Sequence, residues 1–131
     1  MRRIMTGSGR FAALRDKAKR GFRGYPVATI AYYGPDASRA TKVAVGIIVA
    51  EGEEPSAVQR WHSADADVRF DQQILGAALD FIAGHHVKTV ALSARIIGCP
   101  HEEGIDYPLN EKCPACLYWA DRDRWTGEIT R

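Results

Sequence analysis

Apolar and polar positions along this chain follow two periods, which divide it into predicted strands and helices. Residues 25–33 and 42–50 are rich in aromatic and β-branched side chains and flank turn-forming sequence, which predicts a long antiparallel hairpin. Residues 57–62 alternate over a shorter stretch and predict a third strand, at the edge of the same sheet. Residues 89–97 are almost continuously apolar, which is typical of a strand that is buried on both faces.

The helical period first occurs near the N-terminus. Residues 8–20 place Phe11 and Leu14 on one narrow apolar stripe. Ser8 is in position to cap this helix, and Gly21 is in position to end it. We expect the stripe to dock on the rest of the protein, so that the basic residues of the helix face outward.

A second amphipathic segment predicts the main helix, which is capped by Asp65 or Asp67 and runs to about Ala83. Its expected buried face consists of Phe70, Ile74, Ala77, Ala78, Phe81 and Ile82. This helix would cross over the hairpin sheet and lead into the strand at residues 89–97. The predicted fold class is α+β, with an N-terminal helix, a three-stranded antiparallel sheet, a main helix, a fourth strand and a C-terminal loop.

That loop contains all three cysteines of the chain. The order Cys99-x-His101, eleven further residues and Cys113-x-x-Cys116 gives two pairs of soft ligands, as in a tetrahedral zinc site. The sequence therefore predicts a Zn²⁺ site in a zinc-binding segment at residues 99–116, with four protein ligands and a structural role. Another histidine could replace His101 as the fourth ligand, and the candidates are His62, His85 and His86.

Two other interpretations of the cysteines stay open. Cys113 and Cys116 could form a redox dithiol, since Cys-Pro-x-Cys is similar to a glutaredoxin-type motif, although that interpretation leaves Cys99 and His101 unexplained. The cysteines could also be small buried apolar residues without a joint role.

Composition limits the class of protein. A length of 131 residues fits one domain, and no apolar run is long enough for a transmembrane helix. The N-terminus lacks the apolar core of a secretory signal, and an odd number of cysteines argues against a secreted disulfide framework. We therefore expect a cytoplasmic location without membrane attachment.

Charge is distributed unevenly. Residues 1–24 carry +7 and residues 25–131 carry −5, which together give the net charge of +2. We interpret residues 1–24 as a basic N-terminal arm and residues 25–131 as a single α+β domain. Such an arm suits phosphate contacts, although it could instead fold back on the acidic body or bind an acidic protein. The candidate nucleic-acid-binding residues are Arg10, Arg15, Lys17, Lys19, Arg20 and Arg23.

Three resemblances bear on function. The order of strands and helix resembles a ribonuclease H-like fold, but the first strand carries no acid, so the resemblance implies a catalytically degenerate member. The motifs at 101–103 and 113–116 look superficially like those of zinc-dependent nucleotide deaminases, but the connecting residues are too few for the helices of that site. Residues 98–108, 113–116 and 123–127 resemble a group of short uncharacterised bacterial proteins, which implies a bacterial cytosolic protein.

The leading hypothesis is a non-enzymatic, zinc-stabilised module that binds RNA or single-stranded nucleic acid. The basic arm would provide the contacts, together with the aromatic residues Tyr118, Trp119 and Trp125. No catalytic residue is assigned. The alternatives are a zinc-dependent hydrolase or deaminase-like enzyme with an open coordination position, and a protein-interaction adaptor.

Overall fold

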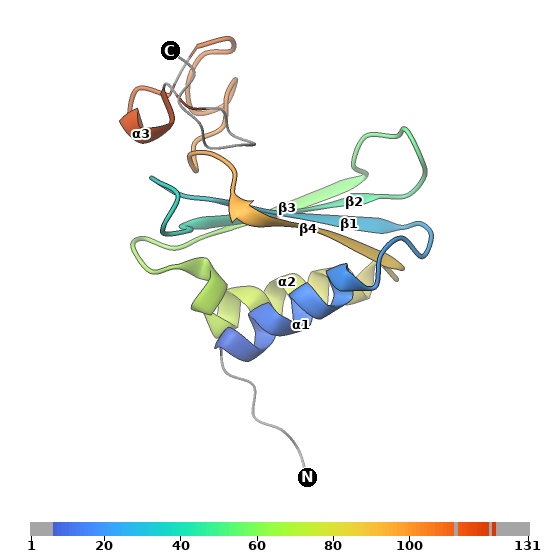
Figure 1. The fold of residues 1–131 in the computed structure, drawn as a ribbon. Helices are drawn as coiled ribbons and strands as arrows, with labels where there is room; N and C mark the ends of the chain where they lie inside the picture. Colours follow the sequence, from blue (N-terminus) through green and yellow to red (C-terminus); the bar gives the residue numbers. More distant parts are fainter. Residues whose placement is uncertain (1–6, 112, 121, 123–131) are drawn as a thin grey trace.

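The computed structural model describes residues 7–111, 113–120 and 122, which form one mixed β-sheet with two helices packed against one of its faces (Figure 1). The segment that follows the last strand lies on the other side of the sheet, opposite the two helices (Figure 1). In chain order the elements are α1 (Gly7–Lys19), β1 (Val27–Tyr33), β2 (Lys42–Ile48), β3 (Ala57–His62), the short 3₁₀ helix η1 (Val68–Phe70), α2 (Gln72–Gly84), β4 (Thr89–Ile96) and α3 (Leu117–Ala120).

The strands lie in the order β3-β2-β1-β4. β1 and β2 form the predicted antiparallel hairpin, in which Val27 is opposite Ile48 and Tyr33 is opposite Lys42. β3 extends the antiparallel part as an edge strand, and β4 pairs with β1 in parallel after the crossover through α2. These observations confirm the α+β class, the hairpin and the edge position of β3.

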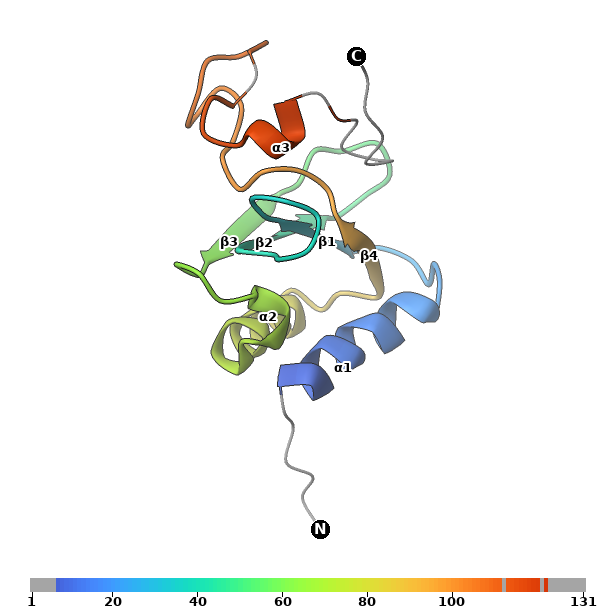
Figure 2. The same cartoon turned by 60° about the vertical axis from the view of Figure 1, so that its left-hand side comes forward.

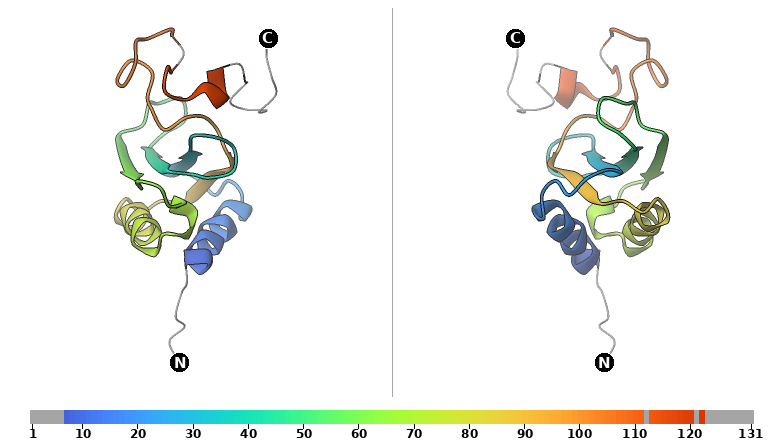
Figure 3. Two further views of the ribbon diagram at one scale, coloured as in Figure 1. Left: turned by 90° about the vertical axis from the view of Figure 1, so that its left-hand side faces the viewer. Right: turned by 90° about the vertical axis from the view of Figure 1, so that its right-hand side faces the viewer.

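The prediction that the last strand is buried on both faces is wrong. β4 is the other edge strand, and Ala91 in its centre is exposed. Both helices cover the same face of the sheet, as the edge-on views show (Figure 3). A continuous apolar run is therefore also compatible with an edge strand that has one covered face, because small side chains such as Ala91 tolerate exposure.

The core lies between the sheet and the two helices. Alternate residues of β1 and β2 point toward the helices and are almost fully buried, as the period of two requires. These inward residues are Ala28, Ile30, Tyr32, Val43, Val45 and Ile47. The helices contribute Leu14, Leu75, Ala78 and Ile82, and burial of each large side chain is worth about 2 kcal/mol.

The first helix docks on the body as predicted. Leu14 is fully buried and Phe11 packs edge-to-face on Tyr32. α1 and α2 lie next to each other below the sheet (Figure 2). Gly21 follows the helix with a φ of +73°, which confirms its role at the C-terminal end. The helix begins at Gly7, so Ser8 lies inside it and does not cap it.

The start of the main helix differs from the prediction. Its cap is Asp71, which accepts a 3.0 Å hydrogen bond from the amide of Ile74. Asp67 instead caps η1, and its side chain accepts a bond from the amide of Arg69. The additional turn changes the buried face: Phe70 is 58% exposed, whereas Leu75, absent from the predicted face, is fully buried.

Within the described part of the chain, none of the helices combines the length and the apolar character needed to cross a bilayer.

Candidate metal centre

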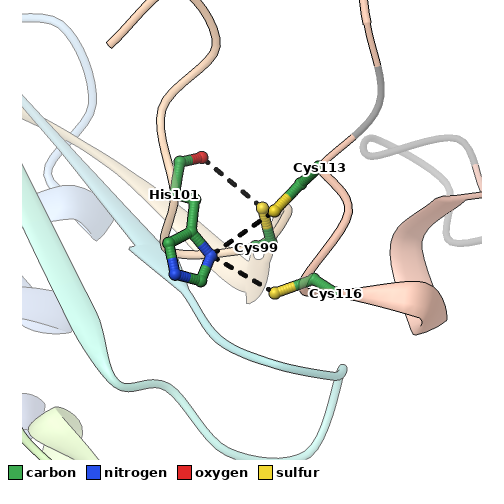
Figure 4. Close-up of side chains that lie close together, drawn as sticks. All are labelled: Cys99, His101, Cys113 and Cys116. Atoms are coloured by element: carbon green, nitrogen blue, oxygen red, sulfur yellow. Dashed lines mark hydrogen bonds between the residues drawn. The ribbon is translucent and has the colours of Figure 1, made fainter. Parts of the chain in front are cut away.

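Four side chains from two separate stretches meet on the side of the sheet that faces away from α1 and α2. Cys99 and His101 follow the end of β4, and Cys113 and Cys116 precede α3. One ligand atom from each residue lies within 4.8 Å of those of the other three (Figure 4). The predicted set of residues is thus brought together, and this cysteine–histidine cluster could hold a metal ion.

The imidazole of His101 faces the sulfur atoms. Its Nδ1 lies 3.5 Å from the sulfur of Cys113 and 3.4 Å from the sulfur of Cys116 (Figure 4). The thiol of Cys99 lies 3.4 Å from the backbone oxygen of His101, so the short Cys-x-His spacing turns both side chains toward one point. The one-residue spacing, which is tighter than usual, is therefore compatible with a common centre.

The protein environment of the sulfurs disfavours thiolates when no cation balances them. Cys113 and Cys116 are buried, and Cys99 is half-buried. Burial, together with the neighbouring Cys99 and Cys113, raises the pKa of Cys116 to about 12. Burial also raises the pKa of Cys99. A bound cation reverses this balance, because thiolates are the form that ligates metal.

The other histidines are distributed elsewhere. His62 is the last residue of β3, and His85 packs edge-to-face on Phe81 after α2. His86 is exposed in the turn before β4. Among the residues that the structure describes, His101 is the histidine that belongs to the cluster.

A buried lysine holds the first ligand pair on the sheet, and the sequence analysis missed it. Lys42 begins β2 and is only 2% exposed. Its Nζ donates to the backbone oxygen of Pro100 at 3.1 Å and to the carboxylate of Glu102 at 2.7 Å. Arg60 of β3 also pairs with Glu102. The alternation in the strands could not show that a loop 60 residues from Lys42 and 42 residues from Arg60 would contact both side chains.

The acidic residues of the loop are used within the structure. Partial burial raises the pKa of Glu102, but hydrogen bonds from Lys42 and Arg60 outweigh this effect and hold the pKa below its usual value. Glu103 accepts a bond from the amide of Asn110, and Asp106 accepts one from the amide of Glu102. These carboxylates stabilise the connection between the two ligand pairs.

A cleft of about 230 Å³ adjoins the cluster. Its walls include the three sulfur-bearing residues together with Glu103, Tyr107 and Trp119. Since Glu103 already accepts a backbone hydrogen bond and Glu102 pairs with two cations, neither carboxylate is held ready as a general base.

The acids that a ribonuclease H-like catalytic site would need are likewise engaged locally. Asp36 lies in the turn after β1, where it accepts bonds from the amide and the hydroxyl of Ser38. Asp71 caps α2. Among the described residues, the cysteine–histidine cluster is the group of potential metal ligands.

The candidate nucleic-acid-binding residues are not equivalent. Arg10 is folded onto α2 and donates to the backbone oxygen of Gln72. Arg15 lies over the ring of Phe11, with its guanidinium carbon 5.7 Å from the ring centre, and Lys19 is exposed. The remaining three, Lys17, Arg20 and Arg23, line a small hollow beside the start of β4.

The predicted aromatic contacts are only partly described. Trp119 is half-buried and packs against the hydrophobic core. Tyr118 packs edge-to-face on Trp119, and the guanidinium of Arg122 lies over its ring at 4.2 Å. Trp125, like the tail motif at residues 123–127, lies outside the described residues.

Comparison of the chain with protein-family models, with curated proteins and with solved structures finds no match.

Proposed function

We propose that the protein is a zinc-stabilised domain that binds single-stranded nucleic acid, with RNA as the leading ligand. The observation that carries the zinc part is the convergence of three sulfurs and one imidazole nitrogen within 4.8 Å. Three thiolates and one imidazole match the preference of Zn²⁺ for soft and borderline ligands in tetrahedral geometry. Thiols stay reduced in a reducing compartment, and we therefore propose that the protein is located in the cytoplasm.

The role proposed for zinc is structural. Four protein ligands complete a tetrahedral shell and leave no position for a reacting water. The two carboxylates nearest in sequence to His101 are engaged, Glu102 by Lys42 and Arg60 and Glu103 by a backbone amide. A hydrolase or deaminase-like reaction would need an open position and a free base, so we favour the structural role.

Elemental analysis and zinc-edge X-ray absorption on the purified protein test this proposal. We expect one zinc ion per chain, bound by three sulfurs and one nitrogen. An oxygen ligand from water would contradict the structural role and favour hydrolytic chemistry. Protein that contains no metal and carries an oxidised Cys113–Cys116 pair would instead support the redox dithiol.

The nucleic-acid part of the proposal is supported by the distribution of charge. Residues 1–24 carry +7, and their basic side chains include exposed ones such as Arg15 and Lys19 of α1 and Arg20 just after it. Lys and Arg side chains that neutralise phosphates release counterions, so the affinity should fall steeply with salt.

This part is tested with a short fluorescein-labelled oligouridine, whose binding is followed by fluorescence anisotropy at several salt concentrations. Full-length protein should bind with an affinity that decreases steeply with salt. The matched variant replaces the exposed Arg15, Lys19 and Arg20 by glutamine, which keeps α1 and its buried Leu14. Equal binding by this variant and by the wild type would refute the role of the arm.

A further inference from the structure

A small hollow of about 70 Å³ lies where the C-terminal end of α1 meets the start of β4. Figure 3 shows the chain after α1 running beside the first residues of β4. The floor of the hollow is apolar and is formed by Ile82 and Val90, which are both buried. Four cationic residues surround it, and these are Lys17, Arg20, Arg23 and Lys88. We call this feature the basic hollow.

The four cations come from three parts of the chain. Lys17 belongs to α1, Arg20 and Arg23 to the segment between α1 and β1, and Lys88 to the turn between α2 and β4. Of the residues that the structure describes, no acidic one lines the basic hollow. Four like charges around one point repel each other, and an anion between them would relieve this repulsion.

The backbone on both sides of the basic hollow is fixed. The amide of Arg23 donates to the hydroxyl of Thr89 at 2.8 Å, and the same hydroxyl donates to the backbone oxygen of Gly24 at 2.7 Å. The amide of Lys88 donates to the backbone oxygen of Pro26 at 2.9 Å. The backbone that carries Arg23 and the backbone that carries Lys88 are thus held next to each other.

Size and charge together indicate the ligand. The basic hollow has room for a compact tetrahedral oxyanion but not for a base with its sugar. Arginine forks bind two oxygens of a phosphate, and lysine adds a point charge. We propose that the basic hollow binds one phosphate group, that of a nucleic-acid strand on the function proposed above, through the side chains of Lys17, Arg20, Arg23 and Lys88.

Lys88 distinguishes this site from a generally basic helix, because it lies about sixty-five residues beyond Arg23 in sequence. The test compares Lys88→Gln with Lys19→Gln, which removes the same charge from an exposed position of α1 outside the basic hollow. Both variants are checked for an unchanged melting temperature, and binding to the labelled oligouridine is measured over a range of salt concentrations.

Lys88→Gln should weaken binding about fivefold at about 0.1 M salt and reduce the slope of log K against log salt by about 0.7, because one phosphate contact on a single strand contributes that slope. Lys19→Gln should reduce the affinity and the slope clearly less than Lys88→Gln does, because Lys19 belongs to the basic arm but lies outside the basic hollow. Equal losses in the two variants would overturn the site and leave only diffuse attraction to the arm.

A titration with inorganic phosphate separates this site from the proposed nucleic-acid function. The expected result is a set of amide shifts in a ¹H–¹⁵N spectrum centred on Arg23 and Lys88, beyond those caused by sodium chloride of equal ionic strength. Such shifts in a protein that fails to bind oligouridine would support the phosphate site and refute the nucleic-acid function. Identical shifts with the two salts would overturn the site, whatever the oligouridine result.

Discussion

The indole Nε1 of Trp119 donates a 2.8 Å hydrogen bond to the backbone oxygen of Gly34, in the turn after β1. The amide of Gly34 donates in turn to the backbone oxygen of Gly98 at 2.9 Å. One residue of the turn after β1 thus bonds to the chain on both sides of the cysteine–histidine cluster. A Cβ atom at Gly34 would overlap the carbonyl oxygen of Arg39, so only glycine allows the backbone to approach this closely.

We predict that Trp119→Phe destabilises the protein by about 1–2 kcal/mol, because the ring packing is largely kept while a partly buried carbonyl loses its donor. Urea unfolding of the zinc-loaded protein measures the change. Tyr118→Phe is the matched control, since it keeps the ring that lies under Arg122. Equal stability of Trp119→Phe and the wild type would show that the bond to Gly34 does not help to hold α3 and the cysteine–histidine cluster against the sheet.

Removing one member of the buried ion pair should cost more. In Glu102→Gln the ammonium of Lys42 loses its counter-charge while only 3% of its side chain is exposed. We expect a loss of about 3 kcal/mol in the free energy of unfolding, since an unpaired buried charge is strongly destabilising. The control is Glu103→Gln, whose carboxylate accepts a backbone hydrogen bond and forms no ion pair among the described residues.

A double variant isolates the charge effect in that comparison. Lys42→Met together with Glu102→Gln removes the buried charge and leaves an apolar side chain of similar length. We expect it to be more stable than Glu102→Gln alone. If the double variant is the less stable of the two, the unpaired charge of Lys42 is not the cause of the loss.

The metal proposal predicts a difference between two histidines. His101→Asn removes a cluster ligand and should weaken zinc binding by more than about 100-fold, since even residues that only support a ligand contribute 10–100-fold. His86→Asn is the matched control because His86 is exposed and has a φ of 54°, which asparagine tolerates. Competition with a chromogenic zinc chelator measures both affinities. Comparable affinities in the two variants would remove His101 from the ligand set.

The sequence predicted those parts of the fold that depend on local patterns. The period of two in residues 42–50 predicted one face of Val43, Val45, Ile47 and Val49. The first three are buried, whereas Val49 follows the end of β2 and is 47% exposed. The predicted start of the main helix was wrong because Asp65, Asp67 and Asp71 are all suitable caps. Which of them is used depends on whether Val68 packs into the core and forms its own turn, and this is a tertiary effect.

For the candidate site, the residues that come together could be predicted from the sequence, and their surroundings could not. The spacing of the cysteines and the histidine is typical of a metal site, so the four cluster residues could be predicted from a short segment. Lys42 and Lys88 were missed because lysines are common in exposed positions, and their roles arise from contacts with distant residues. Lys42 reaches Glu102, and Lys88 lines the basic hollow together with Arg23.

The variants above are expected to lower stability, whereas a change at the hydroxyl of Tyr32 is expected to keep or raise it. This hydroxyl is buried and has no hydrogen-bond partner in the described part of the protein. Burial also holds the pKa of Tyr32 well above its usual value, so the group stays neutral. Tyr32→Phe removes an unsatisfied polar group and should leave stability unchanged or raise it by about 1 kcal/mol. A loss of more than about 1 kcal/mol in urea unfolding would mean that the hydroxyl has a partner, such as a buried water.

The last prediction concerns acid stability and the cap of η1. The carboxylate of Asp67 accepts bonds from the amide of Arg69 at 3.0 Å, from its guanidinium, and from the amide of Ala40 at 3.2 Å. Partial burial raises the pKa of Asp67, but these hydrogen bonds outweigh it and the pKa lies below its usual value. The ionised carboxylate therefore stabilises the folded state above the unfolded pKa of about 3.9, and this contribution is lost as the pH falls through the lower folded pKa.

Asp67→Asn should accordingly destabilise the protein by about 1–2 kcal/mol at neutral pH, because asparagine can still cap η1 but loses the charge-assisted bonds from Arg69. The difference between variant and wild type should shrink as the pH falls below about 4, because the wild-type carboxyl also becomes neutral there. Asp65→Asn, which removes only a surface pair with Arg39, should change stability little at any pH. A gap between Asp67→Asn and the wild type that stays constant with pH would assign the effect to the shape of the side chain and not to its charge.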